Sequence, residues 1–169
     1  MYNVNEIRKE FPILSRKINN YDLCYLDNSA SAQKPSLVLN ELNNFYKNEY
    51  SNVHRGLHLL SNKATDKFEN VRNKISTFLG ANNSEEIVFT SGSTEGLNLI
   101  ASGWAENNLK KGDEILLSVM EHHANIVPWH FLREKIGVVL KWVEPNEDGS
   151  LPSNKIFDKI SDKTKLICV

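Results

Sequence analysis

One segment of the sequence combines small residues with the start of a helix, a pattern that suits an anion. Residues 87–90 read as a strand, residues 91–96 form the turn Ser-Gly-Ser-Thr-Glu-Gly, and apolar residues then recur at helical spacing up to Trp104. Small residues let a backbone approach a ligand, and a helix begins with unpaired amides and a positive dipole end. We therefore expect a phosphate at the amides and hydroxyls of Ser93 and Thr94. An ordinary tight turn with a Ser or Thr N-cap fits the segment equally well.

This turn matches neither of the common nucleotide-binding motifs. No Gly-Lys-Ser or Gly-Lys-Thr follows it, as in a Walker loop, and its glycines lack the GxGxxG spacing. ATP and NAD are therefore not the expected ligands.

A second polar segment, residues 121–125 (Glu-His-His-Ala-Asn), follows a strand predicted at 115–118. Ligands of open α/β sheets gather at the carboxyl ends of the strands, where the turn of Ser93 is also expected. A flat imidazole at this edge could stack on a planar cofactor ring. A polar loop before a helix is the alternative interpretation.

Histidines also occur at positions 54 and 58, but the sequence does not favour a metal site. Gly56 disfavours a helix that would hold both rings on one face, and the adjacent histidines of residues 121–125 lack a third ligand at the spacing of zinc motifs. We expect no metal. Arg55 could grip an anion through bidentate hydrogen bonds, or could be a solvated loop residue.

The elements that position these residues follow from hydrophobic periodicity. Apolar spacings of three and four predict helices over 3–10, 35–49, 60–79, 94–106, 126–135 and 154–160. Short apolar runs predict strands over 23–26, 87–90, 115–118, 138–143 and 166–169. Strands alternate with helices from residue 87 on, which indicates βαβ units in a largely parallel sheet and hence an α/β fold.

Composition excludes several classes of protein. Of 169 residues, 40% are hydrophobic and 24% charged, which is too apolar for disorder. Twenty Lys and Arg balance 21 Asp and Glu, so no net positive field favours nucleic acid or an anionic membrane. No apolar run approaches the roughly 20 residues of a membrane span, and the N-terminus lacks a secretory signal pattern. We expect a cytoplasmic protein with two buried thiols, Cys24 and Cys168.

The last predicted strand, at 166–169, runs to the final residue of the sequence. An apolar strand at the edge of a parallel sheet needs cover. We therefore expect the chain to be part of a larger protein, and to aggregate or dimerise when expressed alone.

Three segments together resemble, in order and spacing, the SufS-type cysteine desulfurases: YLDNSASAQKP at 25–35, NVHRGLH at 52–58 and EHHANIVPW at 121–129. The turn at 91–96 is similar as well. These are class V aminotransferase-family enzymes with the fold type I of pyridoxal-phosphate-dependent transferases. The resemblance implies an incomplete, mainly parallel large-domain sheet with flanking helices. About residues 1–35 would belong to a segment associated with the small domain, and about 36–169 to the first part of the large domain.

The resemblance also implies a cofactor and the residues around it. Pyridoxal 5′-phosphate would be held through its phosphate by Ser93 and Thr94, and His122 would stack on its ring and could assist proton transfer. These roles agree with the chemistry read from the residues alone.

Other matched positions are implied on the substrate side and at the dimer loop. His54 and Arg55 would lie near the active site and the dimer contact, and Ser29 and Ala30 would line the substrate mouth. The family more often has Ala where this chain has Ser29.

The implied reaction converts L-cysteine to L-alanine and leaves a persulfide on an enzyme cysteine for iron–sulfur cluster assembly. Family members are homodimers that pass sulfur to an acceptor protein. The Schiff-base lysine, the acidic partner of the pyridine nitrogen and the persulfide cysteine come later than Val169 in the family, so we expect this chain to be inactive alone. Neither Cys24 nor Cys168 is assigned as that cysteine.

Three alternatives to this interpretation stay open. A selenocysteine lyase or another class V aminotransferase would share the same fold. A non-catalytic product of a truncated or split gene would share the sequence without the activity. A plain phosphate-binding α/β module would bind phosphate without any preference for a ring.

Overall fold

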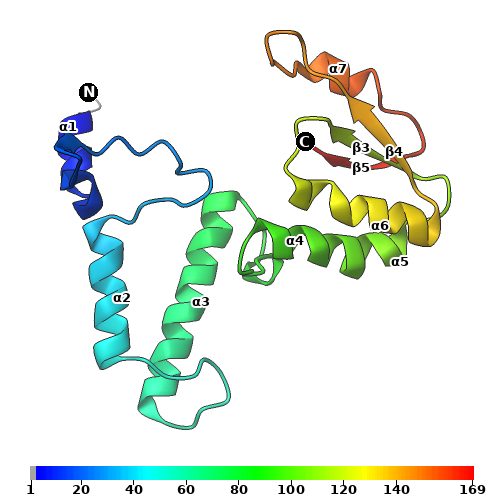
Figure 1. Cartoon of the computed structure of the whole chain (residues 1–169). Helices are drawn as coiled ribbons and strands as arrows, with labels where there is room; N and C mark the ends of the chain where they lie inside the picture. The colour runs from blue at the N-terminus through cyan, green and yellow to red at the C-terminus, as the bar shows by residue number, and fades with distance from the viewer. Residues whose placement is uncertain (1–2) are drawn as a thin grey trace. The chain divides into compact units, whose positions relative to one another are not determined.

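The chain forms two units, and the boundary between them lies between Ile87 and Val88. The computed structural model describes residues 3–169, in which one unit extends to Ile87 and a second runs from Val88 to Val169 (Figure 1). The domain boundary predicted near residue 35 concerns the whole protein and stays a prediction. Residues 1 and 2 of the predicted N-terminal segment lie outside the described residues.

The first unit opens with α1 (Val4–Lys9), as the sequence predicts. The N-cap is Asn3, whose side chain accepts hydrogen bonds from the amides of Asn5 and Glu6. A short 3-10 helix, η1 (Pro12–Ser15), follows. The helix prediction for residues 3–10 is therefore confirmed.

A small hairpin replaces the strand predicted at 23–26. Strands β1 (Lys17–Ile18) and β2 (Tyr21–Asp22) pair antiparallel. They are joined by Asn19 and Asn20, whose φ angles of 51° and 68° are left-handed. Asparagine tolerates this conformation, and two such residues form a tight hairpin turn. The strand predicted at 23–26 is wrong, because the strand pairing involves residues 17–22, just before that apolar run.

Two long helices form the body of the first unit, as predicted: α2 (Ser36–Asn48) and α3 (Leu59–Leu79). Gly80 ends α3 with a left-handed φ of 72°, and its amide donates to carbonyls of the last helical turn. A short 3-10 helix, η2 (Ser84–Glu86), follows.

An ion-pair cluster links α3 to the helix before it. Lys67 of α3 pairs with Glu49, which follows α2, and with Glu41 of α2 at 3.2 Å. Hydrogen bonds to Glu49 and then Glu41 raise the pKa of Lys67 above its usual range. The amino group is therefore charged at neutral pH, and the cluster joins the two helices.

The second unit is a parallel sheet with helices against it (Figure 1). Its strands are β3 (Glu114–Ser118), β4 (Val139–Val143) and β5 (Thr164–Cys168). They lie in the order β4-β3-β5, and both pairings are parallel. The helices α6 (Val127–Ile136) and α7 (Ser153–Phe157) supply the crossovers. The βαβ interpretation is thereby confirmed for residues 114–168.

The helix predicted at 94–106 forms with an irregular middle. It consists of α4 (Ser93–Leu99), the π-helical segment η3 (Ile100–Ala105) and α5 (Glu106–Asn108). Segments of this kind widen the helix locally and are common at functional sites.

The core of the second unit lies between this helix, α6 and one face of the sheet. Ile115 and Leu117 of β3 alternate toward the helices and are fully buried, as is Trp129 of α6. Ala101 and Ala105 let the irregular helix pack closely against them. Burial of the central strand therefore fixes where its carboxyl end emerges.

Residues 87–90 do not form the predicted strand. Ile87 has extended dihedral angles, φ −96° and ψ 116°, but none of residues 87–90 pairs with another strand of the described chain. An extended segment becomes a strand only through a ladder partner. The prediction is wrong for the described chain.

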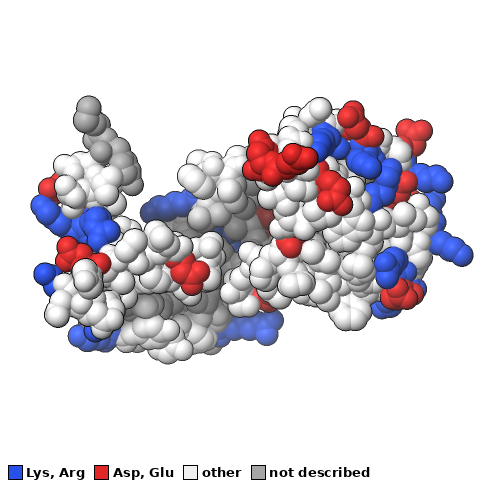
Figure 2. Space-filling model, turned by 45° about the horizontal axis from the view of Figure 1, so that its top comes forward, with Lys and Arg blue, Asp and Glu red and all other residues white. Residues whose placement is uncertain are grey.

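The surface carries both signs of charge. Figure 2 shows Lys and Arg side chains interspersed with Asp and Glu on the face in view, in keeping with the balanced composition. Among residues 3–169, no helix combines the length and the apolar character needed to cross a bilayer.

Candidate functional site

The predicted phosphate turn lies at the start of α4. Ser93 is the first helical residue, and the first hydrogen bond of the helix runs from the Gly96 amide to the Gly92 carbonyl at 3.1 Å. The amides of residues 93–95 therefore precede any intrahelical acceptor. Within the described chain, no hydrogen bond uses the hydroxyls of Ser93 and Thr94. This helix start has donors to offer an anion.

An acidic residue sits in the same first turn but is already engaged. Oε2 of Glu95 accepts hydrogen bonds from the amide and the hydroxyl of Ser91, at 2.5 and 2.7 Å. These two hydrogen bonds lower the pKa of Glu95, and the bond from the Ser91 hydroxyl contributes most. The carboxylate is therefore charged at neutral pH and held by Ser91, while the donors of Ser93 and Thr94 stay available.

The predicted ring-stacking residue, His122, follows the carboxyl end of β3. It is exposed, and it is the N-cap of the 3-10 helix η4 (His123–Asn125). Its Nδ1 accepts the Ala124 amide at 3.1 Å. A neutral ring with Nδ1 as acceptor carries its hydrogen on Nε2.

The two elements that carry the halves of the predicted site contact each other. Helix α4, which begins at Ser93, contacts η4, which begins just after His122. Both elements belong to the second unit. The helix that carries the anion donors thus contacts the segment that carries the exposed imidazole, and this segment follows the carboxyl end of β3.

A hydrogen-bonded chain of side chains holds the loop that carries His122. Glu121 accepts from the hydroxyl of Ser118 at 2.7 Å and from Nδ2 of Asn125 at 2.9 Å. Oδ1 of Asn125 accepts from the indole of Trp129 at 3.1 Å. The sequence does not predict this network, because Glu, Asn and Trp at intervals of four are only a weak signal without the indole hydrogen bond.

Ser29 and Ala30, predicted on the substrate side, lie in an exposed turn of the first unit. The amides of Ala30 and Ser31 both donate to the carbonyl of Asp27, at 3.2 and 3.0 Å. The hydroxyl of Tyr25 closes the turn by donating to the carbonyl of Ser31 at 2.8 Å. The turn is therefore defined by its own hydrogen bonds.

His54 and Arg55 lie in a loop with unusual backbone geometry. Their φ angles are 60° and 55°, both left-handed, which is uncommon for residues with a Cβ. The amide of His54 donates to the Thr65 hydroxyl at 2.9 Å, and its Nε2 lies 3.1 Å from Oε1 of Glu69. The loop is thus tied to α3, and its strain is compensated there.

The second histidine of this loop has a structural role. Nδ1 of His58 accepts the Ser61 amide at 3.3 Å and caps α3. Across residues 3–169, no group of three or more His, Cys, Asp or Glu side chains could hold a metal ion.

The two cysteines differ in burial, and neither is fully buried as the sequence predicts. Cys24 is exposed, because it lies in an irregular segment after β2 and not in a strand. Cys168 ends β5 and is half-buried. Burial, with a smaller contribution from Glu121, raises its pKa to about 11. Its thiol is therefore protonated at neutral pH.

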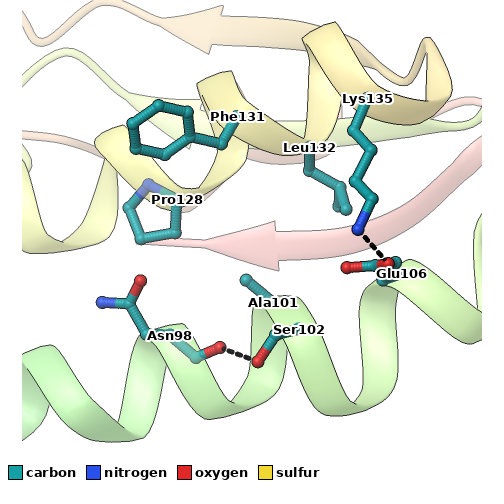
Figure 3. A pocket seen from close by; sticks show the side chains of 8 residues that line it. All are labelled: Asn98, Ala101, Ser102, Glu106, Pro128, Phe131, Leu132 and Lys135. Atoms are coloured by element: carbon teal, nitrogen blue, oxygen red, sulfur yellow. Dashed lines mark hydrogen bonds and ion pairs between the residues drawn. The ribbon is translucent and has the colours of Figure 1, made fainter.

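A groove of about 160 Å³ lies elsewhere in the second unit, between α6 and the irregular helix. Figure 3 shows Pro128 and Phe131 across from Asn98, with the ion pair of Lys135 and Glu106 at one side. None of the predicted site residues lines it.

Comparisons with known proteins find relatives along nearly the whole chain. The family model described as Aminotransferase class-V matches residues 24–169. A cysteine desulfurase of Escherichia coli K12 is 46% identical over 169 residues, which cover all of this chain and 42% of that protein.

Two solved structures are similar along nearly the whole chain. The apo cysteine desulfurase of Thermococcus onnurineus NA1 has a TM-score of 0.84 at 35% identity, and covers 99% of this chain and 40% of that one. The cysteine desulfurase CsdA of Escherichia coli, in an S-sulfonic acid form, has a TM-score of 0.77 at 30% identity, with coverages of 99% and 41%. This chain spans about two-fifths of the length of the relatives it matches.

Proposed function

We propose, because this chain belongs to the aminotransferase class-V family, that the whole protein is a pyridoxal-phosphate-dependent cysteine desulfurase of the SufS type. One observation carries the proposal: α4, whose first turn carries the donors of Ser93 and Thr94, contacts η4, whose N-cap is the exposed His122 that follows β3. The relatives named cysteine desulfurase support the activity.

The donor set fits the cofactor. A helix start with two unused hydroxyls suits a phosphate dianion, and an exposed imidazole suits a flat pyridine ring. When bound, pyridoxal phosphate supplies the electron sink that weakens bonds at the carbon bearing the amino group of the substrate.

The residues of the second unit would then have two separate roles, phosphate binding and ring stacking. Ser93 and Thr94 bind the phosphate through amides and hydroxyls, and so fix the cofactor. His122 stacks on the ring and orients it. Its Nε2, which carries the hydrogen in the neutral form, is the atom at which a proton could be given up.

The residues of the first unit are proposed for the substrate side. Ser29 and Ala30 would line the substrate mouth, as the resemblance implies, and their turn is exposed. His54 and Arg55 would present a cation near the active site and the dimer contact from a loop tied to α3.

The proposed reaction breaks the carbon–sulfur bond of L-cysteine to give L-alanine, and leaves the sulfur as a persulfide on a cysteine. Cys168 does not suit this role, since its pKa of about 11 leaves little thiolate. We place the protein in a homodimer that hands sulfur to an acceptor protein of iron–sulfur cluster assembly. The expected cytoplasmic location stays a prediction.

Calorimetric titration of the cofactor-free whole protein tests the proposal. Its probes are pyridoxal phosphate, pyridoxal and inorganic phosphate. The double variant Ser93→Ala/Thr94→Ala should raise Kd for both phosphate-bearing probes about tenfold or more, because it removes charge-assisted hydrogen bonds. It should leave pyridoxal binding unchanged.

His122→Ala should have the complementary effect, weakening pyridoxal and pyridoxal phosphate but not inorganic phosphate. His123→Ala is the matched control, because His123 is also exposed and lies next in the chain. Pyridoxal phosphate affinity that survives both the double variant and His122→Ala would overturn the site assignment. Phosphate binding without any effect of His122 would indicate a plain phosphate-binding module.

Product analysis separates the remaining alternatives. Alanine formed from cysteine supports the proposed desulfurase. Activity with selenocysteine only, or amino-group transfer to a keto acid, would identify a selenocysteine lyase or an aminotransferase instead.

A further inference from the structure

The loop that carries His122 is closed by side chains that do not touch its ring. It leaves the sheet at Ser118, which is 1% exposed and ends β3. The Ser118 hydroxyl donates to Oε1 of Glu121 and accepts the Met120 amide at 3.2 Å. The beginning of the loop is therefore fixed to the buried end of the central strand.

The other end of the loop is fixed to the core through Asn125. Its Nδ2 donates to Oε2 of Glu121, and its Oδ1 accepts from Nε1 of Trp129. An indole N–H can only donate, so this bond determines which way the Asn125 amide faces. Trp129 is fully buried in the hydrophobic core. The buried indole thus fixes the orientation of the Asn125 side-chain amide, and this amide in turn holds Oε2 of Glu121.

His122 lies between these two fixed points. Its ring makes one hydrogen bond within the described residues, from the Ala124 amide to Nδ1. That bond depends on the backbone of residues 122–124, whose ends Glu121 and Asn125 hold. A loop held at both ends keeps Nδ1 as the acceptor and leaves the hydrogen on Nε2.

We propose that Glu121 and Asn125 are positioning residues for His122: bridging Ser118 and Trp129, they hold the imidazole in its Nε2–H form at the ring face of the site. The inference rests on the function proposed above for the role of His122. The juxtaposition itself is a property of the loop and can be tested without any cofactor.

The chemistry of the network distinguishes conservative from disruptive substitutions. Glutamine at position 121 can accept from Asn125 through its oxygen and donate to Ser118 through its nitrogen, because a serine hydroxyl also accepts. Glu121→Gln should therefore preserve the loop. Glu121→Ala removes both bonds, and Asn125→Asp sets two carboxylates against each other.

The first experiment is NMR on the 169-residue chain, with ¹⁵N shifts of the histidine rings and hydrogen exchange of the Ala124 amide. In the unsubstituted chain and in Glu121→Gln, Nδ1 of His122 should show the shift of an acceptor and Nε2 that of an N–H. In Glu121→Ala and Asn125→Asp, the two tautomers should mix and Ala124 exchange should rise about tenfold. The rings of His123 and His130 are internal controls.

Asn107→Ala is a matched control outside the loop, since Asn107 donates to the Gly103 carbonyl at 2.9 Å in the same unit. It should leave the His122 ring unchanged. The indole N–H signal of Trp129 reports whether each variant is folded. A folded Glu121→Ala chain in which His122 keeps a single tautomer would overturn the proposal.

The second experiment is a double-mutant cycle in the whole protein, with pyridoxal as the probe. If Glu121 acts through His122, Glu121→Ala should weaken binding as His122→Ala does, and the double variant should lose nothing further. Additive losses would show that Glu121 acts independently and would contradict the inference. Should pyridoxal not bind at all, the proposed function fails while the ring shifts still decide the positioning role.

Discussion

The two cysteines show how environment sets the reactivity of one residue type. Cys24 is exposed in an irregular segment, whereas Cys168 is half-buried at the end of β5. The pKa of about 11 for Cys168 lies about two units above the ordinary value of 9.0, so its thiolate fraction at pH 8 falls about a hundredfold. The thiolate is the reactive form.

We predict that iodoacetamide at pH 8 alkylates Cys24 and largely spares Cys168. Peptide mass spectrometry of the unsubstituted chain measures both rates in one sample, and the Cys24→Ser variant isolates the slower one. Cys168 should react at least tenfold more slowly than Cys24 because it carries less thiolate. Equal rates in the folded chain would show that Cys168 is not shielded as described.

Residue identities near His122 could be predicted in part from the sequence. Ser93, Thr94 and His122 stand out because small, hydroxylic and aromatic-ring residues follow apolar runs, and the structure brings their elements together. The roles of Asn125 and Trp129 could not be predicted, because they arise from one indole hydrogen bond inside the core. Such a bond depends on packing and not on local pattern.

At the scale of elements, the loop before α3 is the most constrained segment of the first unit. Gly56 follows two left-handed residues, and a Cβ at Gly56 would lie 2.1 Å from Oγ and 2.3 Å from Cβ of Ser61. Ser61 is buried, and its hydroxyl donates to the Asn52 carbonyl at 2.9 Å. Neither side of this contact can easily move.

We predict that Gly56→Ala lowers the free energy of unfolding of the first unit by about 1–3 kcal/mol through this clash. Gly80→Ala is the comparison, because a Cβ there meets no atom within 4 Å and only the left-handed φ of 72° opposes it. Its cost should be nearer 1 kcal/mol. Urea denaturation followed by far-ultraviolet circular dichroism measures both; a smaller loss for Gly56→Ala than for Gly80→Ala would contradict the packing argument.

A hydrogen-bonded cluster centred on Glu114 connects the strands at the amino end of β3. Its Oε2 accepts from Ser161 at 2.6 Å, from Lys141 at 3.1 Å and from Thr164 at 3.2 Å. The Ser161 bond, then Lys141 and Thr164, lower the pKa of Glu114 below its ordinary value of 4.5. These contacts connect β3, β4 and the start of β5.

We predict that this cluster stabilises the second unit above about pH 4.5 and fails in acid. A carboxyl group with a lowered folded pKa contributes fully above its unfolded pKa, and the contribution is lost as the pH falls through the folded value. Glu114→Gln should therefore lower the urea midpoint at pH 7, and the difference should shrink toward pH 3. Glu147→Gln, in an exposed turn, is the control; a Glu114→Gln effect independent of pH would refute the electrostatic origin.

Long helices could be predicted well from the sequence, and β-strands, which depend on pairing, less well. Helices α2 and α3 follow from apolar spacing because each repeats over several turns, and Gly80 marks an end. The hairpin at 17–22 was signalled by Asn19 and Asn20, but its strands are too short to show alternation. Residues 87–90 have a strand composition, yet pairing depends on a neighbour that the local sequence does not encode.

At the scale of the whole molecule, the predicted α/β architecture of fold type I is confirmed. The likeness to two cysteine desulfurase structures covers 99% of the chain, and the described sheet is parallel. Several large apolar side chains are exposed, including Leu26, Leu57 and Phe78. Association of the isolated chain through such surface stays a prediction.

We predict that the 169-residue chain by itself forms no alanine from cysteine. The Schiff-base lysine that the resemblance implies is expected outside these 169 residues, and neither of the cysteines in the chain is assigned the persulfide role. Amino-acid analysis after incubation with cysteine and pyridoxal phosphate measures the product, and the whole protein is the positive control. Alanine above the level given by free cofactor would show that another lysine serves.

The π-helical segment η3 has a consequence for the phase of the helix that carries the phosphate donors. Its wider turns place Ser93 at an azimuth that an unbroken α-helix of the same length would not reach. If the same six residues of Ile100–Ala105 wound as a regular α-helix, the Ser93 end would rotate by roughly 100° about the helix axis. The hydroxyls of Ser93 and Thr94 would then face another direction, so the orientation of these donors depends on the widened turns of η3 further along the helix.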